Sequence, residues 1–332
     1  MRRIIDEHIK KYPAMTTQDK VKLIFQNEFG CGHFIKDKDK SLALINEEVE
    51  NCYKRDTIFE DIGNGYVRMY LSALDEKSFD AQIINELFIL SAESTSGTKE
   101  GLLNKLALLE DDGYKAGYIE SGCPVVSHSE EYKSSYHPAY RVIKKIYADL
   151  YFLCLEIKKL SSAKDIVISL DGRAAAGKTT AAEALKRVFN AEVIHADDFF
   201  LPFEMRTNER LSEAGGNIHY ERLKAEVTDK LSDTTITYGR FDCSKGYVTE
   251  KVTIKKAPVT VIEGAYSSHP VLGDVYDLKV FFDIDSNTQK ERILKRNGEE
   301  MLKRFTETWI PMENKYIDHF GIKDKADIII RT

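Results

Sequence analysis

The chain has 332 residues, more than one compact domain usually contains, so we expect two domains. Its formal net charge is −6, with 42% hydrophobic and 31% charged residues, a balance that predicts an ordinary soluble protein with apolar cores and argues against a nucleic-acid-binding protein. No apolar run is long enough for a signal peptide or a membrane span, and five scattered cysteines without a CxxC pair favour the reducing cytoplasm over disulfides or structural zinc.

Residues 1–162 are predicted to form a predominantly α-helical domain of unknown role. The segment 16–29 opens with Thr16 and Thr17 as candidate caps, and its apolar residues then recur at roughly helical spacing. Similar patterns predict helices over residues 40–54, 79–94 and 99–113, and one long helix from Pro138 to about Leu160.

Residues 163–332 are predicted to form a second domain of the α/β class. Short apolar, partly β-branched runs alternate there with helical patterns, and such alternation indicates a mostly parallel, here five-stranded, sheet flanked by helices. The expected strands are residues 165–170, 191–196, 257–264, 278–285 and 326–330. The expected helices include residues 179–189, 219–231 and 287–297.

A phosphate-binding loop follows the first of these strands. Its pattern, G-x-x-x-x-G-K-[ST], is matched in full by Gly172-Arg173-Ala174-Ala175-Ala176-Gly177-Lys178-Thr179. Small residues let backbone amides surround phosphate oxygens, Lys178 places a charge on the transferring phosphates, and the Thr179 hydroxyl can ligate Mg²⁺. The following helix directs its positive end at the anion. We therefore expect a fold of the P-loop NTPase type in which these residues and Thr180 bind ATP.

Acidic residues end the next two strands along the chain. Asp197 and Asp198 follow the second strand, and a carboxylate there can accept the proton of an attacking hydroxyl and help to position Mg²⁺. Glu263 ends the third strand, where it could hold Mg²⁺ through water. The structural alternatives are a helix cap or turn for the Asp pair and an ordinary buried partner for the Glu.

These segments resemble the uridine kinase and phosphoribulokinase group. In that group an Asp-Ser-Phe-Tyr-like segment carries the catalytic base; Asp197 matches the base, whereas Asp198 replaces the Ser and Phe200 the Tyr. The Glu-Gly pair at Glu263 and the final strand introduced by Ala-Asp are also similar to that group. The resemblance covers about residues 164–332 and implies transfer of the ATP γ-phosphoryl group to a hydroxyl of a small molecule, with Mg²⁺ as cofactor.

Two arginines are candidates for closing over the phosphates. Arg292 and Arg296 are four residues apart, so they share one helix face. Related kinases fold a basic lid over ATP, where guanidinium groups neutralise charge on the transferred phosphoryl group. The alternative is a solvated basic helix face.

The acceptor is not fixed by the sequence. Residues 215–223 and the strand-rich segment 234–254 replace the nucleoside-reading stretch of uridine kinases, and four of their side chains could line an acceptor pocket. These are Tyr220, Tyr238, Arg240 and Asp242. Uridine or a related nucleoside is the first expectation, with pantothenate-like and sugar hydroxyls as competitors.

The N-terminal half carries a second concentration of polar residues. His33, His128 and His137 lie among further polar residues near helix ends, with Cys31 and Arg141 nearby in the sequence. A metal site and an anion site are both conceivable, and the structural alternative is that these groups cap helices and satisfy buried partners. A wider alternative for the whole chain is a binding protein in which ATP switches the grip of the helical domain on a partner. A further alternative is a degenerate kinase domain kept as a scaffold.

Overall fold

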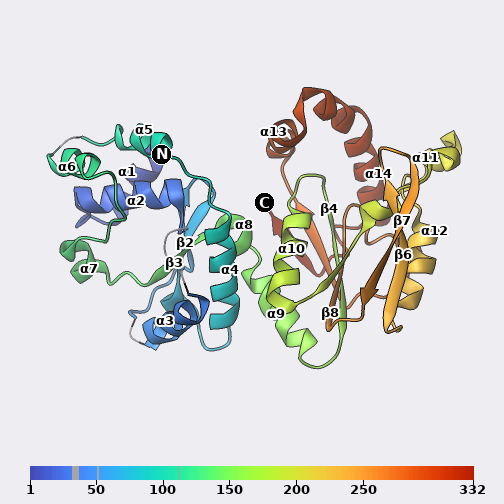
Figure 1. Cartoon of the computed structure of the whole chain (residues 1–332), viewed down its shortest axis with the longest axis horizontal. Coiled ribbons are helices and arrows are strands. Elements are labelled where there is room, and N and C mark those ends of the chain that lie inside the picture. Colours follow the sequence, from blue (N-terminus) through green and yellow to red (C-terminus); the bar gives the residue numbers. More distant parts are fainter. Residues whose placement is uncertain (32–36, 51, 111) are drawn as a thin grey trace. The chain divides into compact units, whose positions relative to one another are not determined.

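The computed structural model describes residues 1–332 except 32–36, 51 and 111. The chain divides into two compact units, Met1–Leu155 and Glu156–Thr332, each of which is described by itself (Figure 1). The domain boundary that we place at residue 162 lies a few residues beyond this division. Among the described residues, no helix combines the length and apolarity that a membrane crossing needs.

The first unit is mainly helical. Helix α2 (Thr17–Phe29) begins at a capping box, in which Thr16 and Asp19 satisfy each other's backbone amides. Its inner face buries Val21 and Ile24 in an apolar cluster. The other helices are α1 (Arg2–Lys11), α3 (Lys38–Glu50), α4 (Ala81–Glu93), α5 (Lys99–Leu106), α6 (Tyr114–Glu120), α7 (Glu130–Tyr136), α8 (Lys145–Ala148) and α9 (Tyr151–Ser161), inside which the division lies.

A three-stranded antiparallel sheet also belongs to this unit and was not predicted. Its order is β1 (Phe59–Gly63), β2 (Tyr66–Tyr70) and β3 (Tyr140–Lys144). The long helix predicted from Pro138 to Leu160 is therefore wrong. Its first part pairs with β2, so that Val142 lies opposite Arg68, and only its second part is helical. Pairing with a partner far away in the sequence overrode a helix-compatible local pattern.

The second unit contains the predicted five-stranded sheet. Its order is β10-β9-β4-β8-β5 and all neighbours are parallel. The expected α/β class with helices beside a parallel sheet is confirmed. The strands are β4 (Ile166–Gly172), β5 (Glu192–His195), β8 (Val259–Glu263), β9 (Leu278–Asp283) and β10 (Ile328–Arg331).

Helices and a hairpin complete this unit. Helix α10 (Lys178–Phe189) packs against β4, β5 and β8. One apolar cluster joins Leu223 and Tyr316 of two further helices to Ile194, Ile262 and Phe281 of the sheet. Strands β6 (Thr235–Asp242) and β7 (Tyr247–Lys255) pair as an antiparallel hairpin. The remaining helices are α11 (Asn208–Ser212), α12 (Tyr220–Glu226), α13 (Ser286–Arg304) and α14 (Ile310–Phe320).

Candidate functional site

The loop between β4 and α10 has a backbone that requires small residues. Gly172 has φ +133°, and a Cβ there would lie 2.2 Å from the carbonyl oxygen of Phe282. Gly177 also has a positive φ, +95°, and so does Ala175, +59°. L-residues with larger side chains rarely adopt such angles. The glycines of the motif are therefore demanded by the path of the chain itself.

Side chains hold the carbonyl groups of this loop. Lys178 Nζ donates to the carbonyl oxygens of Gly172 and Arg173, at 2.8 and 2.9 Å. The next three carbonyls each accept a hydrogen bond from a side chain. Gln289 Nε2 donates to the carbonyl oxygen of Ala174, Arg292 Nη1 to that of Ala175, and Thr332 Oγ1 to that of Ala176. Because five successive carbonyls are engaged, the loop is held in one conformation before any ligand arrives.

The start of α10 completes a site suited to phosphate. Gly177 is the cap of this helix, and Lys178 is its first residue. The first amides of a helix lack intrahelical partners and carry partial positive charge. Lys178 is buried, whereas Thr179 and Thr180 are exposed. The residues at this point fit a bound polyphosphate.

Glu263, at the end of β8, faces the same place. Both of its carboxylate oxygens lie within hydrogen-bond distance of Thr179 Oγ1, at 3.3 and 3.4 Å. His195 Nδ1 lies 2.5 Å from Glu263 Oε1, and this bond, more than any other contact, raises the pKa of His195. One hydroxyl and one carboxylate at this spacing form an oxygen donor set of the kind that Mg²⁺ prefers.

Asp197 and Asp198 lie on a 3₁₀ turn, Ala196–Phe199, directly after β5. The side chain of Asp197 reaches solvent. Loss of water around the carboxylate raises the pKa of Asp197, and so does the negative charge of Glu263. The positive charges of Lys178 and His195 oppose the shift. Asp198 is buried instead, and burial raises its pKa. The two adjacent acids therefore occupy different environments, and Asp197 belongs to the mouth of the phosphate loop.

Curated proteins match about half of this chain. It is 26% identical over 186 residues to the uridine kinase of Ligilactobacillus salivarius, and this match covers 50% of this chain and 85% of that protein. It is 28% identical over 193 residues to the uridine kinase of Lactococcus lactis subsp. cremoris strain MG1363, with 50% and 88% covered. The C-terminal half of this chain is uridine kinase-like.

The coverage of other relatives is uneven. Uridine-cytidine kinase C of Dictyostelium discoideum is 25% identical over 173 residues, and the match spans 49% of this chain but 38% of that protein. A solved structure, described as a possible uridine kinase from Bacillus stearothermophilus, aligns with 56% of this chain and 99% of its own, at 20% identity and a TM-score of 0.45. No protein-family model matches the chain. The curated relatives thus support a P-loop kinase at the level of the family.

The uridine kinase-like half contains one acid that sequence reasoning passed over. Glu313, on α14, is buried, and its Oε2 accepts a hydrogen bond from the amide of Ala174 in the phosphate loop, at 3.0 Å. Burial raises the pKa of Glu313 to about 7, against the attraction of Lys178. The only signal in the sequence was an acid inside an otherwise apolar helix face.

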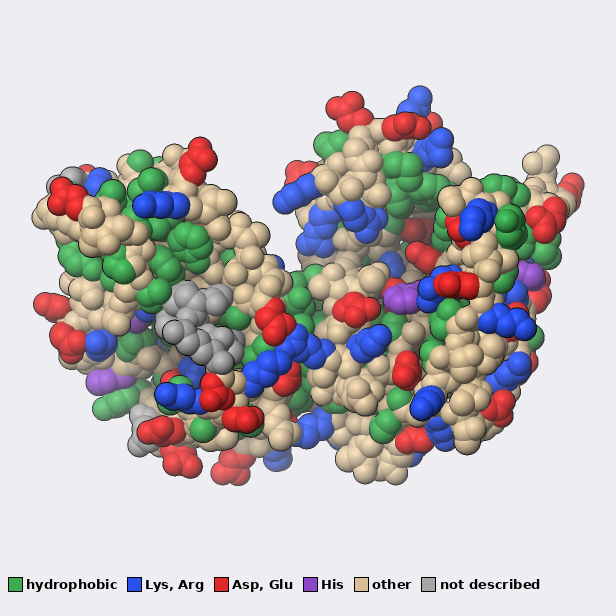
Figure 2. Space-filling model, viewed as in Figure 1, with side chains coloured by type: hydrophobic (Ala, Val, Ile, Leu, Met, Phe, Trp, Pro, Cys, Tyr) green, Lys and Arg blue, Asp and Glu red, His purple; other side chains and the backbone are tan. Residues whose placement is uncertain are grey.

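The two candidate lid arginines differ in position. Arg292 donates to Ala175 of the loop at 3.2 Å and to Thr332 Oγ1 at 3.1 Å. Arg296 is exposed and bonds to the side chain of its neighbour Asn297. Basic side chains gather on this part of the second unit (Figure 2). The structure brings Arg292, but not Arg296, to the loop.

The four candidate acceptor residues also separate into two pairs. Tyr238 lies close enough to Asp198 to lower the pKa of that acid, and Arg240 Nε lies 3.5 Å from the Asp198 carboxylate. The Asp242 carboxylate accepts the amides of Ser244 and Lys245 in the hairpin turn. Tyr220 stacks on His269, with ring centroids 4.4 Å apart. Tyr238 and Arg240 therefore lie beside the acid pair, whereas Asp242 and Tyr220 hold local structure.

Of the histidines singled out in the N-terminal half, the two that the structure describes contact different partners. His33 lies outside the described residues. His137 stacks on Tyr53 with ring centroids 4.0 Å apart, whereas His128 bonds to Asp19 and Tyr140. Within the described part of the chain, no group of three or more His, Cys, Asp or Glu side chains could hold a metal ion.

Proposed function

We propose that residues 163–332 transfer the γ-phosphoryl group of ATP to a hydroxyl of uridine or a related nucleoside. The observation that carries the proposal is the contact between Thr179 of the phosphate loop and Glu263 at the end of β8, at 3.3 Å, with Asp197 close enough for the charges of Glu263 and Lys178 to act on it. The names of the curated relatives support the choice of a nucleoside as the first acceptor to test.

In this proposal Asp197 is the general base. Its raised pKa makes it a stronger proton acceptor than an ordinary carboxylate. Its position after β5 is the carboxyl end of a parallel strand, where open α/β sheets bind their ligands. The acceptor hydroxyl would lie between Asp197 and the γ-phosphoryl group, with Tyr238 and Arg240 nearby.

The remaining groups would bind the nucleotide. The loop amides and Lys178 would hold the phosphates, and Arg292, with Arg296 if α13 moves, would neutralise their charge. Thr179 and Glu263 would hold Mg²⁺, with Asp197 near it; when bound, the ion neutralises charge on the phosphates. Catalysis here rests on position and charge rather than on a covalent intermediate.

The test is ADP release from ATP and Mg²⁺ with and without uridine. We expect release that depends on uridine and saturates with it. Asp197→Asn should lower kcat by about 10²–10⁴-fold with the KM for ATP nearly unchanged, because the phosphates and Mg²⁺ would keep Lys178, Thr179 and Glu263 as partners. Slow release that is independent of every added nucleoside, or full turnover by Asp197→Asn, would contradict the assignment.

A further inference from the structure

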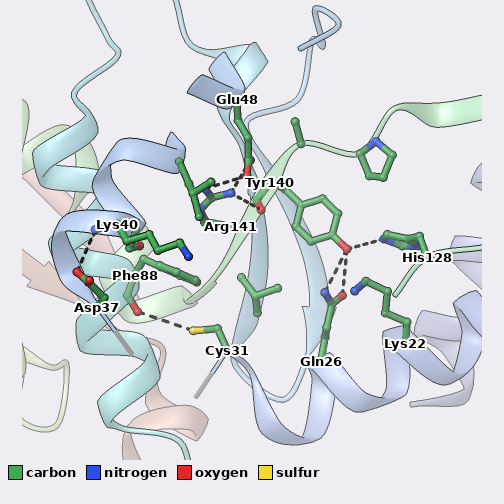
Figure 3. A pocket seen from close by; sticks show the side chains of 15 residues that line it. Lys22, Gln26, Cys31, Asp37, Lys40, Glu48, Phe88, His128, Tyr140 and Arg141 are labelled. Carbon is green, nitrogen blue, oxygen red and sulfur yellow. Dashed lines mark hydrogen bonds and ion pairs between the residues drawn. The ribbon is translucent and has the colours of Figure 1, made fainter. Parts of the chain in front are cut away.

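A cavity of about 520 Å³ opens in the first unit, and none of its lining residues belongs to the phosphate site (Figure 3). Its walls come from α2, α3, α4 and the start of β3, with His128 from the segment before α7. This volume lies within the range of roughly 300–1,000 Å³ that small-molecule sites occupy. Residues that are far apart in the sequence meet here, including His128 and Arg141, which the sequence analysis singled out, and Gln26.

Lys22 of α2 supplies the first cation of this cavity. Its Nζ donates to the carbonyl oxygen of Val126 at 2.9 Å, and no carboxylate of the described part of the chain pairs with it. Burial, and then the charge of Arg68, lower the pKa of Lys22 to about 8. An ammonium group that has lost water and has no counter-ion gains strongly from a bound anion.

The acid nearest in sequence to Lys22 is already engaged. Asp19 accepts hydrogen bonds from His128 Nδ1 at 2.8 Å and from the amide and hydroxyl of Ser129 at 3.0 and 2.6 Å. Although burial opposes this, these bonds hold the pKa of Asp19 well below its ordinary value. The carboxylate is thus fixed by its own partners, and although its charge raises the pKa of Lys22, the two groups form no direct ion pair.

Arg141 of β3 supplies the second cation. Its Nη1 and Nη2 bind the two carboxylate oxygens of Glu48 at 2.7 and 3.2 Å. The guanidinium is nearly buried, whereas 38% of the Glu48 side chain is exposed. A forked pair of this geometry is the way arginine binds carboxylates and phosphates. Glu48 therefore occupies the position that an anionic group of a ligand could share or take.

Hydrogen bonds hold the wall between Lys22 and Arg141 in place. The Tyr140 hydroxyl lies 2.6 Å from His128 Nε2 and 3.1 Å from Gln26 Nε2 (Figure 3). Behind it, the fully buried Arg68 stacks over the Tyr140 ring at 4.8 Å and donates to Gln26 Oε1. Burial lowers the pKa of His128 to about 4, so this ring is neutral near pH 7. The network fixes the aromatic wall and adds positive charge behind it.

The rest of the lining includes a third cation, Lys40, with the Asp37 carboxylate, and an apolar surface. Phe88, Leu44 and Val142 contribute to it, and Cys31 adds a buried thiol that donates to the carbonyl oxygen of Phe88. Burial raises the pKa of Cys31 to about 12, so the thiol stays protonated near neutral pH and is a poor nucleophile. A cavity that combines these cations with an apolar side suits a molecule that has both kinds of surface.

We propose that the first unit binds a small organic anion, whose phosphate or carboxylate group meets Lys22 and Arg141 and whose apolar body packs against Phe88 and Leu44. The proposal is independent of the phosphoryl transfer assigned to the second unit. It concerns a separate site that would take a substrate or an effector of its own.

The test is calorimetric titration of the full chain with phenyl phosphate, benzoate and benzyl alcohol. Mg²⁺ and a non-hydrolysable ATP analogue are kept present, so that the phosphate loop does not compete for the probes. We expect phenyl phosphate or benzoate to bind and benzyl alcohol, which lacks the charge, not to bind. Whichever anion binds more tightly identifies the acidic group. Equal binding of benzyl alcohol, or no binding of either anion at millimolar concentration, would overturn the proposal.

Two variants with opposite expected effects locate the site. Lys22→Met should weaken anion binding by about tenfold or more, because a charge-assisted bond is lost. Lys10→Met removes an exposed lysine of the same unit and should change nothing. Glu48→Gln removes the competing carboxylate from Arg141 and should tighten binding severalfold. If Lys22→Met fails to fold, Glu48→Gln still decides, since unchanged or weaker binding would refute the role of Arg141.

Discussion

The phosphate loop and the cavity of the first unit both present cations to a ligand, but they are built differently. In the loop, Lys178 is fixed by carbonyl groups of residues five and six positions before it. In the cavity, Lys22 and Arg141 are brought together from α2 and β3, with Arg68 of β2 buried behind them. One site is encoded in a short contiguous segment, whereas the other exists only when the unit is folded.

This difference has an energetic consequence. The loop also has buried charges, Lys178 and Glu263 among them, but Lys178 is held by carbonyl groups of its own segment. The first unit buries Arg68 completely and balances it with Glu60, whose pKa falls to about 2 under the charge of Arg68 although burial opposes this. A site assembled from buried charges depends on every partner being present. The following predictions test that contrast, from the largest effect to the smallest.

Arg68→Met should destabilise the first unit strongly. It leaves Glu60 buried without its main counter-charge and should lower the free energy of unfolding by about 3–5 kcal/mol. Lys11→Met is the matched control, because Lys11 Nζ lies 2.5 Å from the same carboxylate but its side chain is 48% exposed. That change should cost at most about 1 kcal/mol. Urea unfolding followed by circular dichroism measures both, and equal losses would remove the contrast.

Lys178→Met should abolish most phosphoryl transfer without unfolding the chain. Three of the five loop carbonyls keep their partners, so the loop should retain its shape. The loss of one charge at the transferring group should lower the rate by about 10²–10³-fold. Lys186→Met, an exposed lysine on the same helix, should leave the rate unchanged. A rate within threefold of the parent for Lys178→Met would mean that the loop does not hold the reacting phosphates.

Glu313→Gln should alter the pH dependence of nucleotide binding. With a pKa of about 7, Glu313 is neutral below that pH and negative above it, beside a loop that would hold phosphates. The affinity for ATP of the parent should therefore fall relative to that of the variant, by severalfold, as pH rises from 6 to 8. Taking the ratio of the two dissociation constants at each pH cancels the titration of ATP itself. A ratio that stays constant with pH would show that Glu313 does not act on the nucleotide.

The accuracy of the sequence-based assignments follows the same division. In the second unit each predicted strand of the sheet is present, because a buried parallel strand is a short apolar run whatever its neighbours are. In the first unit the sheet was missed. Residues 140–144 became β3 by pairing with β2, and the Asn64-Gly65 turn between β1 and β2, where both residues have positive φ, was the overlooked hairpin signal.

The sequence alone determined the phosphate loop, the order of strands and helices around it, and the identity of the acids that follow β5 and β8. These depend on local backbone geometry and on short-range patterns, which contiguous residues carry. Tertiary structure decided that Glu313 contacts the loop, that Arg292 rather than Arg296 reaches it, and that Lys22, Tyr140 and Arg141 share a cavity. Such contacts depend on which distant segments pack together, and burial then shifts the pKa of each charged group. No local pattern specifies either the packing or the shift.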